Sequence, residues 1–98
     1  MIEDKALDER LTKLIEECSE IIQIASKIKL WGFDSYHPRD ESQTTNRTLL
    51  EHEIGDLIVI LELMYPSGDI SYDNVHDRII VKTKKINKYL QHNKVKNV

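Results

Sequence analysis

The stretch LTKLIEECSEIIQIASKIKL, residues 11–30, decides the fold class of this chain. Apolar residues return along it every three or four positions without a proline, which is the spacing of one face of an α-helix. They are Leu11, Leu14, Ile15, Cys18, Ile21, Ile22, Ala25 and Ile28. We therefore predict a helix from about residue 7 to residue 30. It ends before Gly32, because glycine commonly follows the last helical residue.

Two further helices are predicted downstream. Thr45, Asn46 and Thr48 are helix-start residues, and Thr48 with Glu51 has the spacing of a capping box. This second helix runs to about Met64, and the turn residues YPSGD (65–69) reverse the chain. A third helix is expected over about 72–92, with Val75, Ile79, Ile86 and Leu90 on one face.

No alternating strand pattern is present, so the sequence predicts an all-α fold. We expect an antiparallel helical bundle of three main helices in a single domain, residues 1–98. Three helices of this length bury limited area alone. We therefore expect homo-oligomerisation, as a homodimer or a homotetramer, to complete the bundle.

Composition limits the classes of partner. The net charge of −3 gives no general basic field, which argues against binding to a nucleic acid polymer. Every long apolar run is interrupted by charge, so no membrane segment is predicted. The single cysteine, Cys18, excludes an internal disulfide, fits a reducing compartment and is expected to be a small buried hydrophobe. We expect a cytoplasmic protein, in the host cytoplasm if a phage encodes it.

Acidic residues occupy positions that should be apolar. Glu17 and Glu53 fall inside the apolar faces of the first two helices, and Glu20 and Asp56 fall at the edges of those faces. Residues three apart on a helix are neighbours, so each pair can hold one object. If the two helices pack face to face, four carboxylates converge, and a divalent cation such as Mg²⁺ or Mn²⁺ would offset their repulsion. A single E-x-x-E pair is usually only a solvated face.

The predicted third helix carries the opposite charge. Lys82 lies within its apolar face, with Arg78 and Lys85 alongside. Together with metal ions, these cations would make a clamp for a triphosphate. The alternative for Lys82 is a stem lying along apolar surface with its amine in water.

These motifs resemble a known family. LIEECSEIIQ (14–23) followed by LLEHEIGDLIVIL (49–61) is similar to the E-x-x-E … E-x-x-D signature of the MazG-like, all-α nucleoside triphosphate pyrophosphohydrolases. The likeness is greatest to compact, single-domain members often found in phages. The segments ASK (25–27), WGF (31–33) and TNR (45–47) also resemble that family, and the similarity spans about residues 8–92.

The resemblance implies hydrolysis of a nucleoside or deoxynucleoside triphosphate to the monophosphate and pyrophosphate. It also implies Mg²⁺, or Mn²⁺ in its place, held by Glu17, Glu20, Glu53 and Asp56. Because compact phage-type members include enzymes directed at dGTP, dGTP or GTP is the expected substrate. Either Glu20 or Glu16 would act as general base.

Other residues are assigned to the phosphates and the base. The expected phosphate ligands are Arg78, Lys82, Lys85 and Lys27, although Lys27 is also placed to pair with Glu20. Trp31 and Phe33 would either stack on the base or close one end of the bundle. Asn46 would either bind a base edge or cap the second helix.

A different class of function fits the same residues. In that alternative the chain is a non-catalytic helical module for oligomerisation or partner binding. Its acidic residues would then pair with Lys82 and Arg78 across the bundle.

Overall fold

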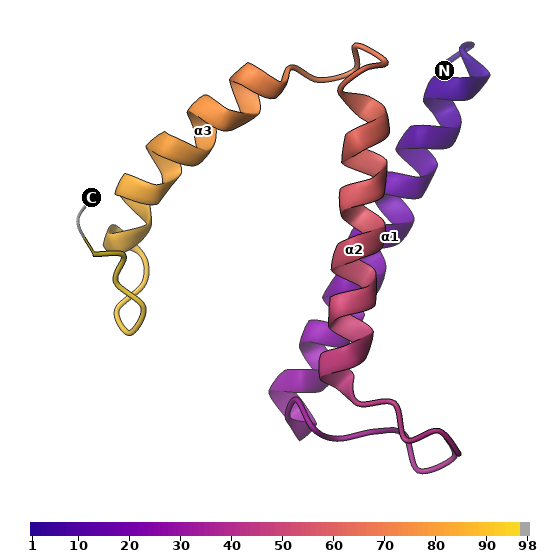
Figure 1. Cartoon of the computed structure of the whole chain (residues 1–98), viewed down its shortest axis with the longest axis vertical. Coiled ribbons are helices and arrows are strands. Elements are labelled where there is room, and N and C mark those ends of the chain that lie inside the picture. Colours follow the sequence, from indigo (N-terminus) through magenta and orange to yellow (C-terminus); the bar gives the residue numbers. More distant parts are fainter. Residues whose placement is uncertain (97–98) are drawn as a thin grey trace. The chain divides into compact units, whose positions relative to one another are not determined.

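The computed structural model describes residues 1–96, and these residues contain helices and no strand (Figure 1). The helices are α1 (Lys5–Trp31), α2 (Asn46–Met64), α3 (Tyr72–Lys85) and the short 3₁₀ helix η1 (Ile86–Lys88). The predicted all-α fold class is confirmed. Within the described residues, no helix combines the length and the apolar character that crossing a membrane requires.

Helix α1 begins and ends where its local chemistry predicts. The Asp4 carboxylate accepts hydrogen bonds from the backbone N–H groups of Ala6 (3.0 Å) and Leu7 (3.2 Å), which caps the N-terminus. At the other end, Gly32 has a φ of 89° and donates its N–H to the Ile28 carbonyl at 2.8 Å. The positive φ explains why glycine stands at this position.

Helix α2 begins at Asn46, and its cap differs from the prediction. The Thr45 hydroxyl accepts a hydrogen bond from the Thr48 N–H at 3.3 Å, so Thr45 is the capping residue. The expected capping box of Thr48 and Glu51 is wrong, because both residues already lie inside the helix. A capping role for Asn46 is also wrong, since the Asn46 side chain donates to the Gly32 carbonyl at 3.2 Å.

Helices α1 and α2 run antiparallel and side by side, joined by the connection 32–45 (Figure 1). Their packing buries only three hydrophobic residues among those described, namely Ile24, Ile60 and Met64. Cys18 is exposed, so its prediction as a buried hydrophobe is wrong. The hairpin therefore holds itself together with a small core and leaves much apolar surface uncovered.

Among the described residues, 65–96 belong to a second compact unit, distinct from Met1–Met64. Its turn contains Gly68, with a φ of 82°, as the YPSGD pattern predicts. The third helix ends at Lys85, earlier than the predicted residue 92. The chain turns back because the Asn87 side chain bonds both backbone groups of Val95, the N–H at 2.6 Å and the carbonyl at 2.8 Å. The single domain and the self-association stay predictions.

Candidate functional site

Three carboxylates converge in the α1–α2 hairpin. Glu17 and Glu20 come from consecutive turns of α1, and Glu53 comes from the facing side of α2. One carboxylate oxygen from each of the three lies within 4.8 Å of the others. The sequence analysis predicts that four carboxylates converge, and three of those four residues lie together here. We call these three residues the acidic cluster.

The acidic cluster contains buried oxygen atoms that lack partners. Glu17 and Glu53 are partly buried, whereas Glu20 is exposed. Oε2 of Glu17 and Oε2 of Glu53 are both inaccessible to solvent and accept no hydrogen bond. Burying a carboxylate oxygen without a partner is costly, since the oxygen loses its water and gains nothing in return. The cluster is therefore incomplete without a proton or a cation.

Electrostatics within the acidic cluster change the protonation of Glu53. Its hydrogen bond with Glu20, its burial and its hydrogen bond with Glu17 raise the pKa of Glu53 from 4.5 to about 7. Each cause favours the protonated form, because a protonated Glu53 can donate a hydrogen bond to a neighbouring carboxylate and because burial removes the water that would solvate the charge. Near neutral pH, a proton thus competes with any cation for this site.

The donor set fits a hard divalent cation. All three groups are carboxylates, and oxygen-only ligands suit Mg²⁺ and Mn²⁺ rather than softer metals. The two partnerless oxygens of Glu17 and Glu53 are the atoms for which such a cation would provide a partner. With the cation bound, the mutual repulsion of the carboxylates would become an attraction to a shared charge.

Two acidic residues from the sequence analysis lie outside this arrangement. Asp56 is exposed one turn beyond Glu53 and is not part of the acidic cluster. Glu16 is also exposed, and its carboxylate pairs with the Lys13 ammonium at 3.0 Å. Of the two candidates for general base, only Glu20 is therefore a member of the cluster.

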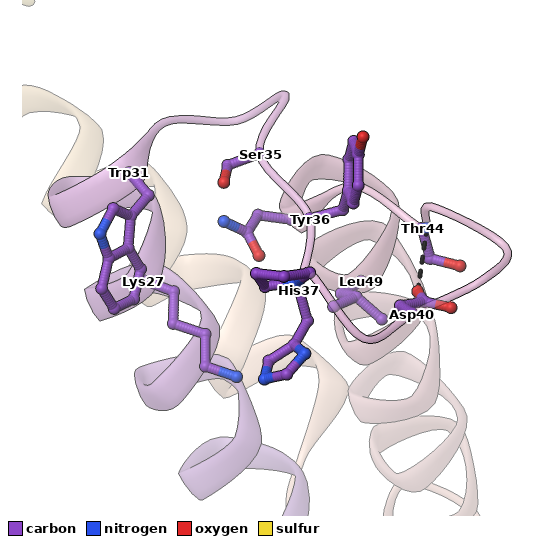
Figure 2. A pocket seen from close by; sticks show the side chains of 10 residues that line it. Lys27, Trp31, Ser35, Tyr36, His37, Asp40, Thr44 and Leu49 are labelled. Atoms are coloured by element: carbon purple, nitrogen blue, oxygen red, sulfur yellow. Dashed lines mark hydrogen bonds between the residues drawn. The ribbon is translucent and has the colours of Figure 1, made fainter.

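A pocket of about 430 Å³ lies at the end of the hairpin where the connection joins α1 to α2 (Figure 2). Residues from the last turns of α1, the connection and the first turn of α2 line it. They are Lys27, Trp31, Ser35, Tyr36, His37, Pro38, Asp40, Thr44, Asn46 and Leu49. Figure 2 shows Lys27 and Trp31 projecting from α1 and His37 projecting from the connection.

Hydrogen bonds hold the connection in place around this pocket. One Asp40 oxygen accepts the N–H of Ser42 at 3.0 Å and its hydroxyl at 2.6 Å. The other accepts the N–H of Thr44 at 3.0 Å, the bond dashed in Figure 2. These bonds hold the pKa of Asp40 below its usual value, the Ser42 hydroxyl being the largest cause. The pocket wall is therefore formed before any ligand arrives.

One contact determines the tautomer of the neutral His37 ring. Its Nδ1 accepts a hydrogen bond from the backbone N–H of Arg39 at 3.1 Å. An atom that accepts cannot carry a proton, so the neutral ring carries its proton on Nε2. His37 thus brings a hydrogen-bond donor to the pocket, as does the Lys27 ammonium.

The three expected base-binding residues differ in whether they line the pocket and in whether their side chains are free to contact a base. Trp31 lines the pocket and is 65% exposed, so its ring is free for stacking. Phe33 does not line it, and the Arg47 guanidinium lies 4.5 Å from the centre of its ring. Asn46 lines the pocket but is buried, and its side-chain amide donates a hydrogen bond to the Gly32 carbonyl.

The expected phosphate ligands are also divided. Lys27 lines the pocket, and no ion pair within residues 1–96 joins it to Glu20. Arg78, Lys82 and Lys85 are exposed on α3 in the second unit. The Lys82 ammonium lies 5.0 Å from the centre of the Tyr89 ring, as expected for a stem that keeps its amine at the surface. Phosphate binding by these three residues stays a prediction.

Several pocket residues were missed at the level of sequence. Ser35, Asp40, Thr44 and Leu49 show no helical periodicity that would group them. The D-x-S-x-T pattern of residues 40–44 was an available signal, since Asp with Ser or Thr two and four positions later favours a side-chain-bonded turn.

Comparison of this chain with models of known protein families, with characterised proteins and with solved structures finds no match. The resemblance to the MazG-like family stays a prediction.

Proposed function

We propose that the chain is a metal-dependent pyrophosphohydrolase of nucleoside triphosphates, with dGTP or GTP as the first expected substrate. The observation that carries the proposal is the acidic cluster, in which two buried carboxylate oxygens have no partner. A stable fold that needed no ligand here would gain from apolar residues at positions 17 and 53. A divalent cation bound between these oxygens would offset the cost of burying them.

The position of the pocket supports a nucleotide as the substrate. Lys27 follows Glu20 by seven residues, or two turns, so the two side chains lie on one side of α1 about 10 Å apart along its axis. This separation is comparable to that between the α-phosphate and the base of a nucleotide. Phosphate at the acidic cluster would thus bring the base to the pocket.

The donors in the pocket favour a base with a carbonyl group. Lys27 and the Nε2–H of His37 both donate and cannot accept. The O6 and N7 atoms of guanine are both acceptors, whereas adenine offers N7 as an acceptor but a donating 6-amino group in place of O6. The exposed Trp31 ring would stack on the base. The pocket thereby supports guanine over adenine.

In the proposed reaction, a protein side chain takes part in one proton transfer. A water oxygen attacks the α-phosphorus, the bond from that phosphorus to the bridging oxygen breaks, and pyrophosphate leaves with the bridging oxygen. Glu20, the exposed member of the acidic cluster, accepts the proton of the water. The bound cation would supply charge neutralisation at the phosphates and a lower pKa of water. Glu17 and Glu53 would hold the cation.

The test is release of pyrophosphate from the common nucleoside and deoxynucleoside triphosphates, with Mg²⁺, with Mn²⁺ and with EDTA. We expect metal-dependent release that is greatest for dGTP or GTP. Glu53→Gln should abolish it, while Glu51→Gln, an exposed residue of the same helix outside the cluster, should leave it unchanged. Absence of release from every triphosphate with either metal would overturn the proposal.

The alternative function is a non-catalytic helical module. The apolar surface that α1 and α2 leave exposed favours it, including Ile15 and Ile22, each about two-thirds exposed. This alternative needs no metal, and it predicts that Glu53→Gln destabilises the protein by leaving a partner cation unpaired. The pyrophosphate assay and the stability of that variant separate the two functions.

A further inference from the structure

The charges of this chain are unevenly divided along the sequence. Seven of the 14 Lys and Arg residues fall within residues 78–98, which contain none of the 17 Asp and Glu residues. Residues 78–98 thus carry a formal charge of +7 and residues 1–77 carry −10, which together give the −3 of the whole chain. The net charge that argues against nucleic acid is therefore an average over two regions of opposite sign. We call residues 78–98 the basic region.

The cations of the basic region are exposed and have no acidic partners. All seven lie at the surface of the second unit, and none forms an ion pair among residues 1–96. Cations gathered in this way repel one another and create a local positive potential that attracts anions. A partner with several negative charges is the chemistry that such a surface fits.

Helix α3 gathers three of these cations on one side. Arg78, Lys82 and Lys85 are spaced four and three residues apart, so at 100° per residue they leave the helix within about 60° of one another. They span about 10 Å along the axis. Lys84 leaves the same helix at least about 100° away from each of them. We call Arg78, Lys82 and Lys85 the basic row.

A folded loop holds further cations together after η1. The Asn87 side chain bonds the N–H and the carbonyl of Val95, and the Lys94 ammonium donates to the Asn87 carbonyl. These bonds bring Lys94 and Lys96, the residues on either side of Val95, close to Lys88, which follows Asn87. Hydrogen bonds to the backbone thus position these charges before any ligand binds.

An exposed aromatic ring lies beside the basic row. Tyr89 is 67% exposed, and the Lys82 ammonium lies over its ring, 5.0 Å from the centre. An ammonium over one face of a ring leaves the opposite face for a flat partner. A pocket of about 360 Å³ is lined by Tyr89 and residues 90–93, which include the amide side chains of Gln91 and Asn93. Cations for phosphates, a ring for stacking and amides for base edges are the components of a site for single strands.

We infer that the basic region binds single-stranded nucleic acid, with the basic row on the phosphates and Tyr89 stacked on a base. The partner is a single strand rather than a duplex, because the faces of paired bases are covered by their neighbours in the stack. An anionic membrane fits less well, since an interfacial helix keeps its apolar residues on one side. On α3, the consecutive residues Ile79, Ile80 and Val81 are all between 40% and 57% exposed, so they face different sides.

The test is binding of a labelled oligothymidylate of about 12 nucleotides to the full-length protein, followed by fluorescence anisotropy in EDTA. EDTA prevents metal-dependent binding at the acidic cluster, so the result is independent of the proposed enzymatic activity. About four phosphate contacts predict that log Kd rises with log salt concentration with a slope of about 3.

Two lysines of α3 provide a matched pair of variants. Lys82→Gln removes one phosphate contact, so it should weaken binding roughly 8-fold at about 50 mM salt and lower the slope by about 0.7. Lys84→Gln removes the same charge from an exposed position outside the basic row, and it should weaken binding about 2-fold at most. Circular dichroism checks that both variants keep their helices.

Tyr89→Leu separates stacking from charge. Leucine keeps an apolar side chain but cannot stack, so Kd should rise roughly 10-fold with the salt slope unchanged. Absence of binding at low salt, equal effects of Lys82→Gln and Lys84→Gln, or full affinity of Tyr89→Leu would overturn the inference. Binding to vesicles of phosphatidylserine and phosphatidylcholine without binding to the oligonucleotide would overturn it in favour of a membrane surface.

Discussion

Replacing Glu53 with Gln should make the metal-free protein more stable at alkaline pH. Glutamine has nearly the shape of a protonated glutamate and cannot ionise. The substitution therefore removes a negative charge that Glu20 and Glu17 disfavour, while it keeps the packing between α1 and α2. This outcome is unusual, because most substitutions in a helix contact reduce stability.

The sign and size of the effect follow from the pKa of Glu53, which rises from 4.5 to about 7 in the folded protein. The folded state holds this proton more tightly than the unfolded state. Glu53 therefore contributes stability that is complete below pH 4.5 and is lost as the pH rises through 7. A shift of this size corresponds to at most about 3.4 kcal/mol. Partial access of water to the cluster reduces it to about 1–2 kcal/mol.

The assay is urea unfolding followed by circular dichroism, in EDTA, at several pH values from 4.5 to 8. The difference in unfolding free energy between Glu53→Gln and the wild type should be near zero at acidic pH and grow to about 1–2 kcal/mol at pH 8. The control Glu51→Gln should show no such trend, since Glu51 is exposed and lies outside the acidic cluster. A Glu53→Gln variant less stable than the wild type at pH 8 would refute this reasoning and indicate a buried ion pair instead.

Three further predictions concern the pocket and the helix ends. His37→Phe removes the Nε2–H donor, so the ratio of kcat/KM for dGTP to that for dATP should fall about 10-fold, and an unchanged ratio would exclude His37 from base recognition. Asn46→Ala leaves the Gly32 carbonyl without its partner and should lower the free energy of unfolding by about 1–3 kcal/mol in urea; no change would contradict a structural role for this bond. Gly32→Ala should cost about 1 kcal/mol because its φ is positive, whereas Gly55→Ala, inside α2 with open space, should gain about 0.5–1 kcal/mol. Equal effects of the two glycine substitutions on unfolding would contradict the backbone argument.

Local interactions explain why the helices could be predicted from sequence. The apolar spacing of residues 11–30 and the glycine at position 32 fixed α1 to within about two residues. The end of α3 was misplaced because it depends on Asn87 bonding to Val95, eight residues away, which no helical period encodes. The cap of α2 was misplaced by three residues, since Thr45 and Thr48 are chemically alike and only the path of the connection chooses between them.

The candidate site divides in the same way. Sequence alone placed Glu17 and Glu53 inside apolar faces, because a helix's own period determines which residues share a face. Tertiary packing decided that Glu20 joins them while Asp56 does not, since that depends on how α1 and α2 cross. The pocket was likewise decided by the fold: its wall is built by Asp40 binding the backbone of its own connection. Contacts made within one helical turn can thus be predicted from the sequence. Contacts between α1, α2 and their connection depend on the tertiary structure, because they form only when the chain has folded.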